Sequence, residues 1–287
     1  MRLVFIHGMR QEGKAPRELR AAWEGALLSA WSRAGLPKPS YDLEMPFYGD
    51  ELNKLTEAVW GKASAVVTRG EGGPGTFSPL EETLIREMAR KQGVTDTEVR
   101  GDLGQEVVAR GAANWEWVQA IGRVLETKVP ALRDIGLGFV HQVDAYLTRP
   151  HIRTAVDNIV RPSLLRGPAI VVAHSLGTIV AYTILRGAEQ KAQIRLLVTL
   201  GSPLGIGAVK DKIVPPRPLM RPECVSSWLN GTDERDYVAL YARLDRDTFA
   251  EGIENVSDLH NRQEDAHLID DYLSDKTISK RIHDALK

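Results

Sequence analysis

The stretch IVVAHSLG at residues 170–177 decides the fold of this chain. It begins in a continuous apolar run, residues 169–173, which is typical of a parallel strand buried on both faces. A helix is predicted directly behind it, over residues 176–187. Ser175 therefore stands at a sharp strand-to-helix turn, for which the small residues Ala173 and Gly177 leave room.

Ser175 has two interpretations. At the start of a helix, backbone N–H groups favour negative charge, which suits a nucleophile that becomes an alkoxide-like species. Serine is also a common helix cap with no chemical role. The strand before Ser175 and the helix after it favour the nucleophile.

Strands and helices alternate on both sides of this turn. Strands are predicted at residues 3–6, 41–47, 169–173, 194–200 and 224–229, and helices at residues 16–34, 151–165, 176–187 and 275–286. Strands separated by helices indicate a parallel sheet with right-handed crossovers. The predicted fold class is therefore α/β, a mostly parallel sheet flanked by helices.

Residues 51–148 break this alternation, because no convincing strand is predicted there. Apolar spacing predicts helices over residues 80–91, 114–126 and 132–147, and GEGGPG at residues 70–75 predicts a flexible loop. We interpret residues 51–148 as a helical cap, or lid, inserted into a single domain that spans residues 1–287.

Charge and composition exclude some functions. The 287 residues include 37 Lys and Arg against 38 Asp and Glu, a formal charge of -1, so no basic excess supports general nucleic-acid binding. The single cysteine, Cys224, can form neither an intrachain disulfide nor a multi-cysteine zinc site, and it is expected inside a buried strand. The motifs GxxxxGK[ST], GxGxxG and HExxH are absent.

The apolar run that precedes His7 is too short for a signal peptide, and no run approaches the ~18 apolar residues of a membrane span. A cytoplasmic location is therefore expected. The sequence gives no indication of oligomeric state.

The chain resembles α/β-hydrolases, particularly lipase-like bacterial enzymes whose nucleophile turn reads Ala-His-Ser-x-Gly. The resemblance covers residues 1–48 and 151–286 but not the insertion. The general pattern has glycine where this chain has Ala173, the next smallest residue. In that family a His-Gly pair follows the first core strand, as His7 does here, so the resemblance implies oxyanion donors at the backbone N–H groups of Met9 and Leu176. His7 precedes the serine and is expected to be structural.

The family order is serine, acid, histidine, because a serine hydroxyl needs a base to remove its proton. The resemblance favours His267, in a polar loop before the last helix, over His260. His283, in the last helix, is expected to be structural or solvent-facing. Related hydrolases often carry Asp-x-Val after the preceding strand, which favours Asp236 as the acid over Asp233.

The stretch LGSPLG at residues 200–205 resembles the wall of the acyl pocket in lipase-like members. Pro203 prevents a normal nucleophile turn at Ser202, which is therefore expected to be a turn residue.

The implied activity is hydrolysis of a carboxylic ester through an acyl-enzyme on Ser175, with no cofactor. The substrate would be a small-molecule or lipid-like acyl compound. Apolar faces in the insertion suggest a greasy acyl chain, although packing within a cap explains them equally well. Two alternatives stay open: a catalytically silent hydrolase fold that binds a partner, and a thioesterase or amidase with the same triad.

Overall fold

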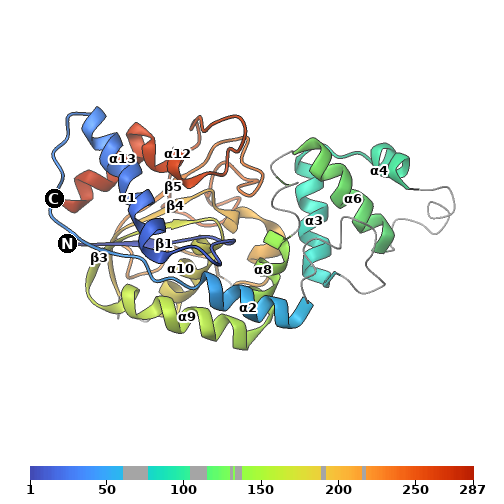
Figure 1. Ribbon diagram of the computed structural model, residues 1–287, viewed down its shortest axis with the longest axis horizontal. Helices are drawn as coiled ribbons and strands as arrows, with labels where there is room; N and C mark the ends of the chain where they lie inside the picture. The colour runs from blue at the N-terminus through green and yellow to red at the C-terminus, as the bar shows by residue number, and fades with distance from the viewer. Residues whose placement is uncertain (61–76, 104–114, 130–131, 133–137, 189–191, 215–217) are drawn as a thin grey trace.

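The computed structural model describes residues 1–60, 77–103, 115–129, 132, 138–188, 192–214 and 218–287. Its centre is a parallel sheet of six strands in the order β2-β1-β3-β4-β5-β6 (Figure 1). The α/β class and the mostly parallel sheet predicted from the sequence are confirmed. The strands are β1 (Arg2–Ile6), β2 (Asp42–Glu44), β3 (Pro168–His174), β4 (Gln193–Leu200), β5 (Trp228–Gly231) and β6 (Glu254–Val256).

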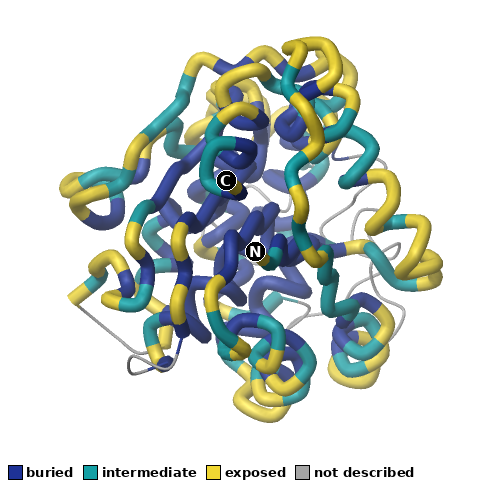
Figure 2. The backbone as a smooth tube through the Cα atoms, turned by 90° about the vertical axis from the view of Figure 1, so that its left-hand side faces the viewer, coloured by how far each residue is buried: buried dark blue, intermediate teal, exposed yellow. Residues whose placement is uncertain are grey.

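Alternate residues of the central strands face two apolar layers. Leu3 and Ile170, which are paired in register, belong to the layer under α1 (Pro16–Arg33), α12 (Ile269–Ser274) and α13 (Lys276–Leu286). Their successors Val4 and Val171 face the layer under α9 (Pro150–Leu165) and α10 (Leu176–Arg186). The sheet is therefore covered on both faces, and Figure 2 shows its strands as a buried centre inside an exposed rim.

The second layer continues into the helices that fall largely within residues 51–148, which are α2 (Gly49–Trp60), α3 (Pro79–Lys91), α4 (Asp96–Asp102), α6 (Trp115–Lys128) and α8 (Gly138–Thr148). No strand occurs in the described part of residues 51–148. α8 packs against α9, whereas α3, α4 and α6 lie beyond it, away from the sheet (Figure 1). The predicted loop at residues 70–75 lies outside the described residues.

One buried carboxylate fastens α3 to the body of the molecule. Glu87 accepts hydrogen bonds from the backbone N–H groups of Gly207 (3.0 Å) and Ala208 (3.3 Å), in the short helix α11 (Gly207–Lys210), and from the Tyr241 hydroxyl (2.9 Å). α3 is thereby tied to the segments that follow β4 and β5.

The strand predicted at residues 224–229 is displaced. Regular pairing with β4 starts at Trp228. Before it, the Val225 N–H donates to the Pro222 carbonyl oxygen in a turn, and Val225 forms an isolated β-bridge with Ile194. Cys224 is therefore half-buried in a turn, with its thiol 3.6 Å from the Leu185 carbonyl oxygen, and not inside a strand.

No helix in the described ranges is long and apolar enough to cross a bilayer.

Candidate active site

Ser175 lies at the turn between β3 and α10 with a φ of 54° and a ψ of −130°. A positive φ is costly for a residue with a side chain and is typically retained at functional sites. Glycines on either side make room: a Cβ at Gly8 would lie 2.7 Å from the Ser175 Cβ, and one at Gly177 would lie 2.4 Å from the His7 carbonyl oxygen. The Ser175 side chain makes no capping hydrogen bond to α10, so the strained turn presents the hydroxyl without using it as a cap.

Asp236 and His267 form a buried pair. The imidazole Nδ1 lies 2.8 Å from Oδ2 and 2.9 Å from Oδ1 of the carboxylate. Asp236 also accepts hydrogen bonds from the backbone N–H groups of Val238 (2.8 Å) and Ala239 (3.2 Å) and from the Tyr272 hydroxyl (2.7 Å). Burial alone would raise the pKa of Asp236, but His267 and these donors hold the pKa below its ordinary value.

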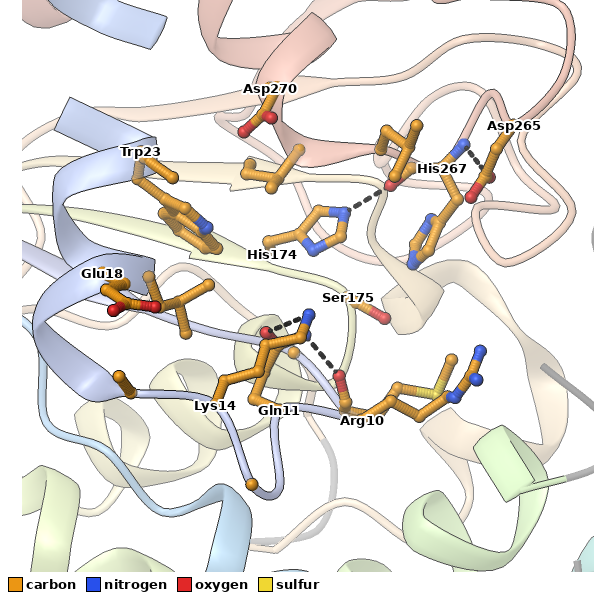
Figure 3. A pocket seen from close by; sticks show the side chains of 18 of the residues that line it. Arg10, Gln11, Lys14, Glu18, Trp23, His174, Ser175, Asp265, His267 and Asp270 are labelled. Atoms are coloured by element: carbon orange, nitrogen blue, oxygen red, sulfur yellow. Dashed lines mark hydrogen bonds between the residues drawn. The ribbon is translucent and has the colours of Figure 1, made fainter. Parts of the chain in front are cut away.

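This arrangement fixes the tautomer of His267. An ionised carboxylate can only accept, so the proton sits on Nδ1 and leaves Nε2 as a proton acceptor. Nε2 and the Ser175 Oγ are both buried and have no hydrogen-bond partner. In Figure 3 the two side chains lie next to each other at the base of the same cleft. No hydrogen bond joins them in this structure, although such contacts are often long before substrate binds.

Two further contacts position His267 in the loop between β6 and α12. Its backbone N–H donates to Asp265 Oδ1 (3.0 Å), and its carbonyl oxygen accepts a hydrogen bond from His174 Nε2 (2.9 Å; Figure 3). Burial lowers the pKa of His174 to about 3, so the ring is a neutral donor. His174, the residue before Ser175, therefore supports the backbone of His267.

The rival residues are either exposed or bound to other partners. His260 is exposed. Asp233 is buried and accepts hydrogen bonds from the side chain of Arg235 (2.7 Å) and from the backbone N–H of Asn261 (2.7 Å), so it holds a loop together. His283 is buried, and its Nε2 donates to the Pro37 carbonyl oxygen at 2.9 Å.

His7 and Ser202 also have local roles. His7 Nε2 accepts a hydrogen bond from the Tyr48 N–H at 3.1 Å, and Nδ1 donates to the Gly8 carbonyl oxygen at 2.7 Å. Ser202 Oγ accepts a hydrogen bond from the Leu204 N–H at 3.3 Å at the start of the 3₁₀ turn Pro203–Gly205.

The two backbone donors implied by the resemblance lie beside Ser175. Leu176 is the first residue of α10, where an N–H has no intrahelical acceptor. Met9 follows Gly8, whose α-carbon lies close to Ser175. Met9 also lines the same cleft as Ser175.

Sequence reasoning missed two supporting residues. Gly201 has a φ of 54°, and a Cβ there would lie 2.8 Å from Asp236 Oδ2 and 3.0 Å from His267 Nδ1. The Tyr272 hydroxyl, besides donating to Asp236, accepts a hydrogen bond from the Asp233 N–H (3.1 Å). The glycine within LGSPLG was the one available signal, whereas no local pattern marks Tyr272.

The Ser175 hydroxyl lies at the base of a cleft of about 790 Å³. Its walls come from the loop after β1, the first half of α1, and the loop that leads into α12. No described residue of 51–148 lines this cleft. One contact reaches its wall from α8: the Gln142 side chain accepts a hydrogen bond from the Arg10 N–H at 3.4 Å. Among the residues described, no group of three or more His, Cys, Asp or Glu is arranged to hold a metal ion.

Comparison of the chain with models of known protein families, with curated proteins and with solved structures found no match. The fold and the site together define an α/β protein with a strained serine turn beside a buried Asp–His pair.

Proposed function

We propose that this chain is a serine hydrolase of the α/β-hydrolase type that cleaves a carboxylic ester through an acyl-enzyme on Ser175. One observation carries the proposal: the Asp236–His267 pair leaves the imidazole Nε2 as an unpartnered acceptor in the cleft that also holds the Ser175 hydroxyl. A serine capping a helix needs neither a strained φ nor a buried histidine–carboxylate pair beside it.

In the acylation half-reaction, Ser175 Oγ attacks the ester carbonyl carbon while His267 Nε2 takes the hydroxyl proton. The N–H groups of Met9 and Leu176 stabilise the negative oxygen of the tetrahedral intermediate. The intermediate collapses with cleavage of the ester C–O bond, and His267 returns the proton to the leaving alcohol. Water then repeats the sequence: His267 takes its proton, the hydroxide attacks the acyl carbon, and Ser175 regains a proton as the acid leaves.

Asp236 supplies the electrostatic part of the mechanism. Burial alone would raise the pKa of this carboxyl group, but His267 and the hydrogen-bond donors hold the pKa below its ordinary value, so the carboxylate stays ionised and faces the Nδ1 proton of His267. The imidazolium formed in each half-reaction is therefore stabilised inside a low-dielectric site, where a charge pair is worth more than in water.

Residues 51–148 serve in this proposal as a helical cap within one domain. The Glu87 contacts of α3 and the Gln142 contact of α8 support a position next to the ends of the strands that carry the site. Closure of such a cap over bound substrate would shield the acylation step from bulk water, and its opening would admit the water that hydrolyses the acyl-enzyme.

The test is covalent labelling with a fluorophosphonate probe, which reacts with activated serines. We expect labelling of the wild-type chain and its loss in Ser175→Ala, while Ser202→Ala, which removes another buried hydroxyl, keeps it. Ester, thioester and amide substrates with a common acyl group then identify the bond that is cleaved.

A folded wild-type chain that neither labels nor hydrolyses any of these substrates would contradict the proposal. The buried Ser175 Oγ, which makes no hydrogen bond to His267, favours one alternative for that outcome: a catalytically silent hydrolase fold that binds a partner.

A further inference from the structure

The loop that follows β1 carries one of the two proposed oxyanion donors, the backbone N–H of Met9. We call residues 8–13 the oxyanion loop. Arg10, the residue after Met9, lies near Ser175 in Figure 3 and has a φ of 54°. In the described part of the chain, Arg10 and Ser175 are the two residues other than glycine with a positive φ. Such strain persists only where the surrounding structure fixes it, so contacts must hold the oxyanion loop in this conformation.

Two neighbouring side chains hold the peptide groups on either side of Met9. The Gly8 carbonyl oxygen accepts a hydrogen bond from His7 Nδ1 at 2.7 Å. The C=O and N–H groups point in opposite directions across a trans peptide bond, so the Met9 N–H points away from the His7 ring. The Met9 carbonyl oxygen accepts a hydrogen bond from Gln11 Nε2 at 2.8 Å. The orientation of the donor is therefore set by contacts on both sides of it.

Helix α8 holds the same stretch of backbone from outside the loop. The Gln142 side chain, which is 5% exposed, accepts a hydrogen bond from the Arg10 N–H through Oε1 at 3.4 Å. Both polar groups of the Met9–Arg10 peptide bond therefore face a side-chain partner, Gln11 on one side and Gln142 on the other. The hydrogen bond from Arg10 is long and therefore weak, but it acts on the residue with the strained φ.

Helix α2 supports the far end of the oxyanion loop. A Cβ at Gly49, the first residue of α2, would lie 2.9 Å from the Gln11 carbonyl carbon and 3.0 Å from the Glu12 nitrogen. The Asp50 carboxylate accepts a hydrogen bond from the Gly13 N–H at 2.8 Å. α2 and α8 pack against each other and against α9, which covers the sheet. These contacts therefore connect the oxyanion loop to the body of the molecule.

Resting on the function proposed above, we propose that Gln142 and Gly49 are positioning residues for the oxyanion donor. No described residue of α2 or α8 lines the cleft, so both helices act through the oxyanion loop. α8 holds the Arg10 N–H, and α2 lies directly against the backbone of Gln11. Together they keep the Met9 N–H where the negative oxygen of the intermediate forms. This role is separate from that of a cap that closes over the substrate.

The measurement is the ratio of kcat for an ester to kcat for its thionoester, in which sulfur replaces the carbonyl oxygen. Sulfur is a weak hydrogen-bond acceptor, so the oxyanion donors stabilise the thionoester intermediate far less. The ratio therefore reports the position of the Met9 and Leu176 N–H groups. A loss of folded protein, in contrast, lowers both rates equally and leaves the ratio unchanged.

In Gln142→Ala the Arg10 N–H loses its acceptor. We expect kcat for the ester to fall about tenfold, the effect of one lost hydrogen bond, with KM and the thionoester rate nearly unchanged. The ratio then falls about tenfold as well. Gln142→Glu keeps an acceptor oxygen at the same place and should restore the ratio. Gln119→Ala is the matched control, because Gln119 is also 5% exposed but lies in α6, which packs against α3 and α4.

Gly49→Ala tests the contact from α2. The added Cβ would clash with the backbone of the oxyanion loop, which must therefore shift, and we expect the same ratio to fall at least about tenfold. Gly101→Ala in α4 is the control, because no atom lies within 4 Å of its added Cβ, and it should keep the wild-type ratio.

An unchanged ratio in Gln142→Ala and Gly49→Ala would refute the positioning role, and so would an equal loss for ester and thionoester. Fluorophosphonate labelling of Ser175 separates this inference from the function on which it rests. Labelling of the wild-type chain together with unchanged ratios in the variants removes only the positioning role. Absence of labelling in a folded wild-type chain removes the proposed hydrolase and the positioning role with it.

Discussion

At the scale of single residues, the site depends on close approaches that admit no extra atom. Gly201 leaves room for the edge of the His267 ring and for Asp236 Oδ2, and Gly8 leaves room for Ser175. Both members of the proposed base–acid pair, His267 and Asp236, thus pack against the Gly201 backbone, which carries no side chain. A displacement of about 1 Å at such a place can cost roughly a hundredfold in rate.

Gly201→Ala tests this point. The new Cβ would clash with Asp236 and His267, so we expect kcat for ester hydrolysis to fall at least about a hundredfold. Gly35→Ala is the matched control: it has a similar φ of 66°, but no atom lies within 4 Å of its added Cβ. Both variants should lose roughly 1–2 kcal/mol of folding free energy from the positive φ, and only Gly201→Ala should lose activity. Equal activities of the two would show that this approach is unimportant.

At the scale of elements, most of the fold could be predicted because its signals are local. The apolar runs of β1, β3 and β4 and the periodicity of α1, α9 and α10 are all visible in short windows of sequence. The start of β5 could not be predicted, because the apolar residues before Trp228 look equally strand-like and pairing with Leu197 decides where the strand begins.

The residues of the candidate site divide in the same way. Ser175 could be predicted from the strand before it and the helix after it. The choice of His267 over His260, in contrast, depended on the resemblance to a family. The Tyr272 contact to Asp236 spans 36 positions, and the sequence around either residue contains no sign of it.

The attachment of α3 provides a prediction at this scale. Glu87→Ala removes the acceptor for three hydrogen bonds that tie α3 to α11 and Tyr241. Hydrogen bonds to a buried charged group contribute about 1.5–3 kcal/mol each, so we expect faster amide hydrogen exchange in α3 and α11. Glu82→Ala, on the same helix, removes a carboxylate that pairs with Arg86 (2.8 Å), so it is the control and should leave exchange in α11 unchanged. Unchanged exchange in both variants would show that the insertion is held by apolar packing alone.

At the scale of the whole molecule, two neutral buried histidines make folding sensitive to acid. Burial lowers the pKa of His7 to about 4 and that of His174 to about 3, against an ordinary value of 6.5. Below pH 6.5 these two imidazoles therefore bind protons in the unfolded chain but stay neutral in the folded chain. The free energy of unfolding must then fall as the pH decreases. The stability is fully present above pH 6.5 and is lost progressively down to about pH 4 for His7 and about pH 3 for His174.

Denaturant titrations between pH 7.5 and 4.5 measure this loss. Each imidazole should contribute a slope of about 1.4 kcal/mol per pH unit below its unfolded pKa. His7→Gln and His174→Gln should each flatten the slope, whereas His260→Gln, a change at an exposed position, should not. Equal slopes in all four proteins would mean that other groups cause the acid sensitivity.

The walls of the cleft come from the two ends of the chain, with Ser175 supplied from between them. During synthesis, a ribosome therefore releases the serine turn well before Asp236 and His267 have been made. If the proposed mechanism holds, the emerging polypeptide carries a serine without its base until the segment with His267 docks, so it would not yet hydrolyse esters. The proposed activity would then appear in one step, and ester turnover would report whether the segment that carries His267 and α12 has docked onto the sheet.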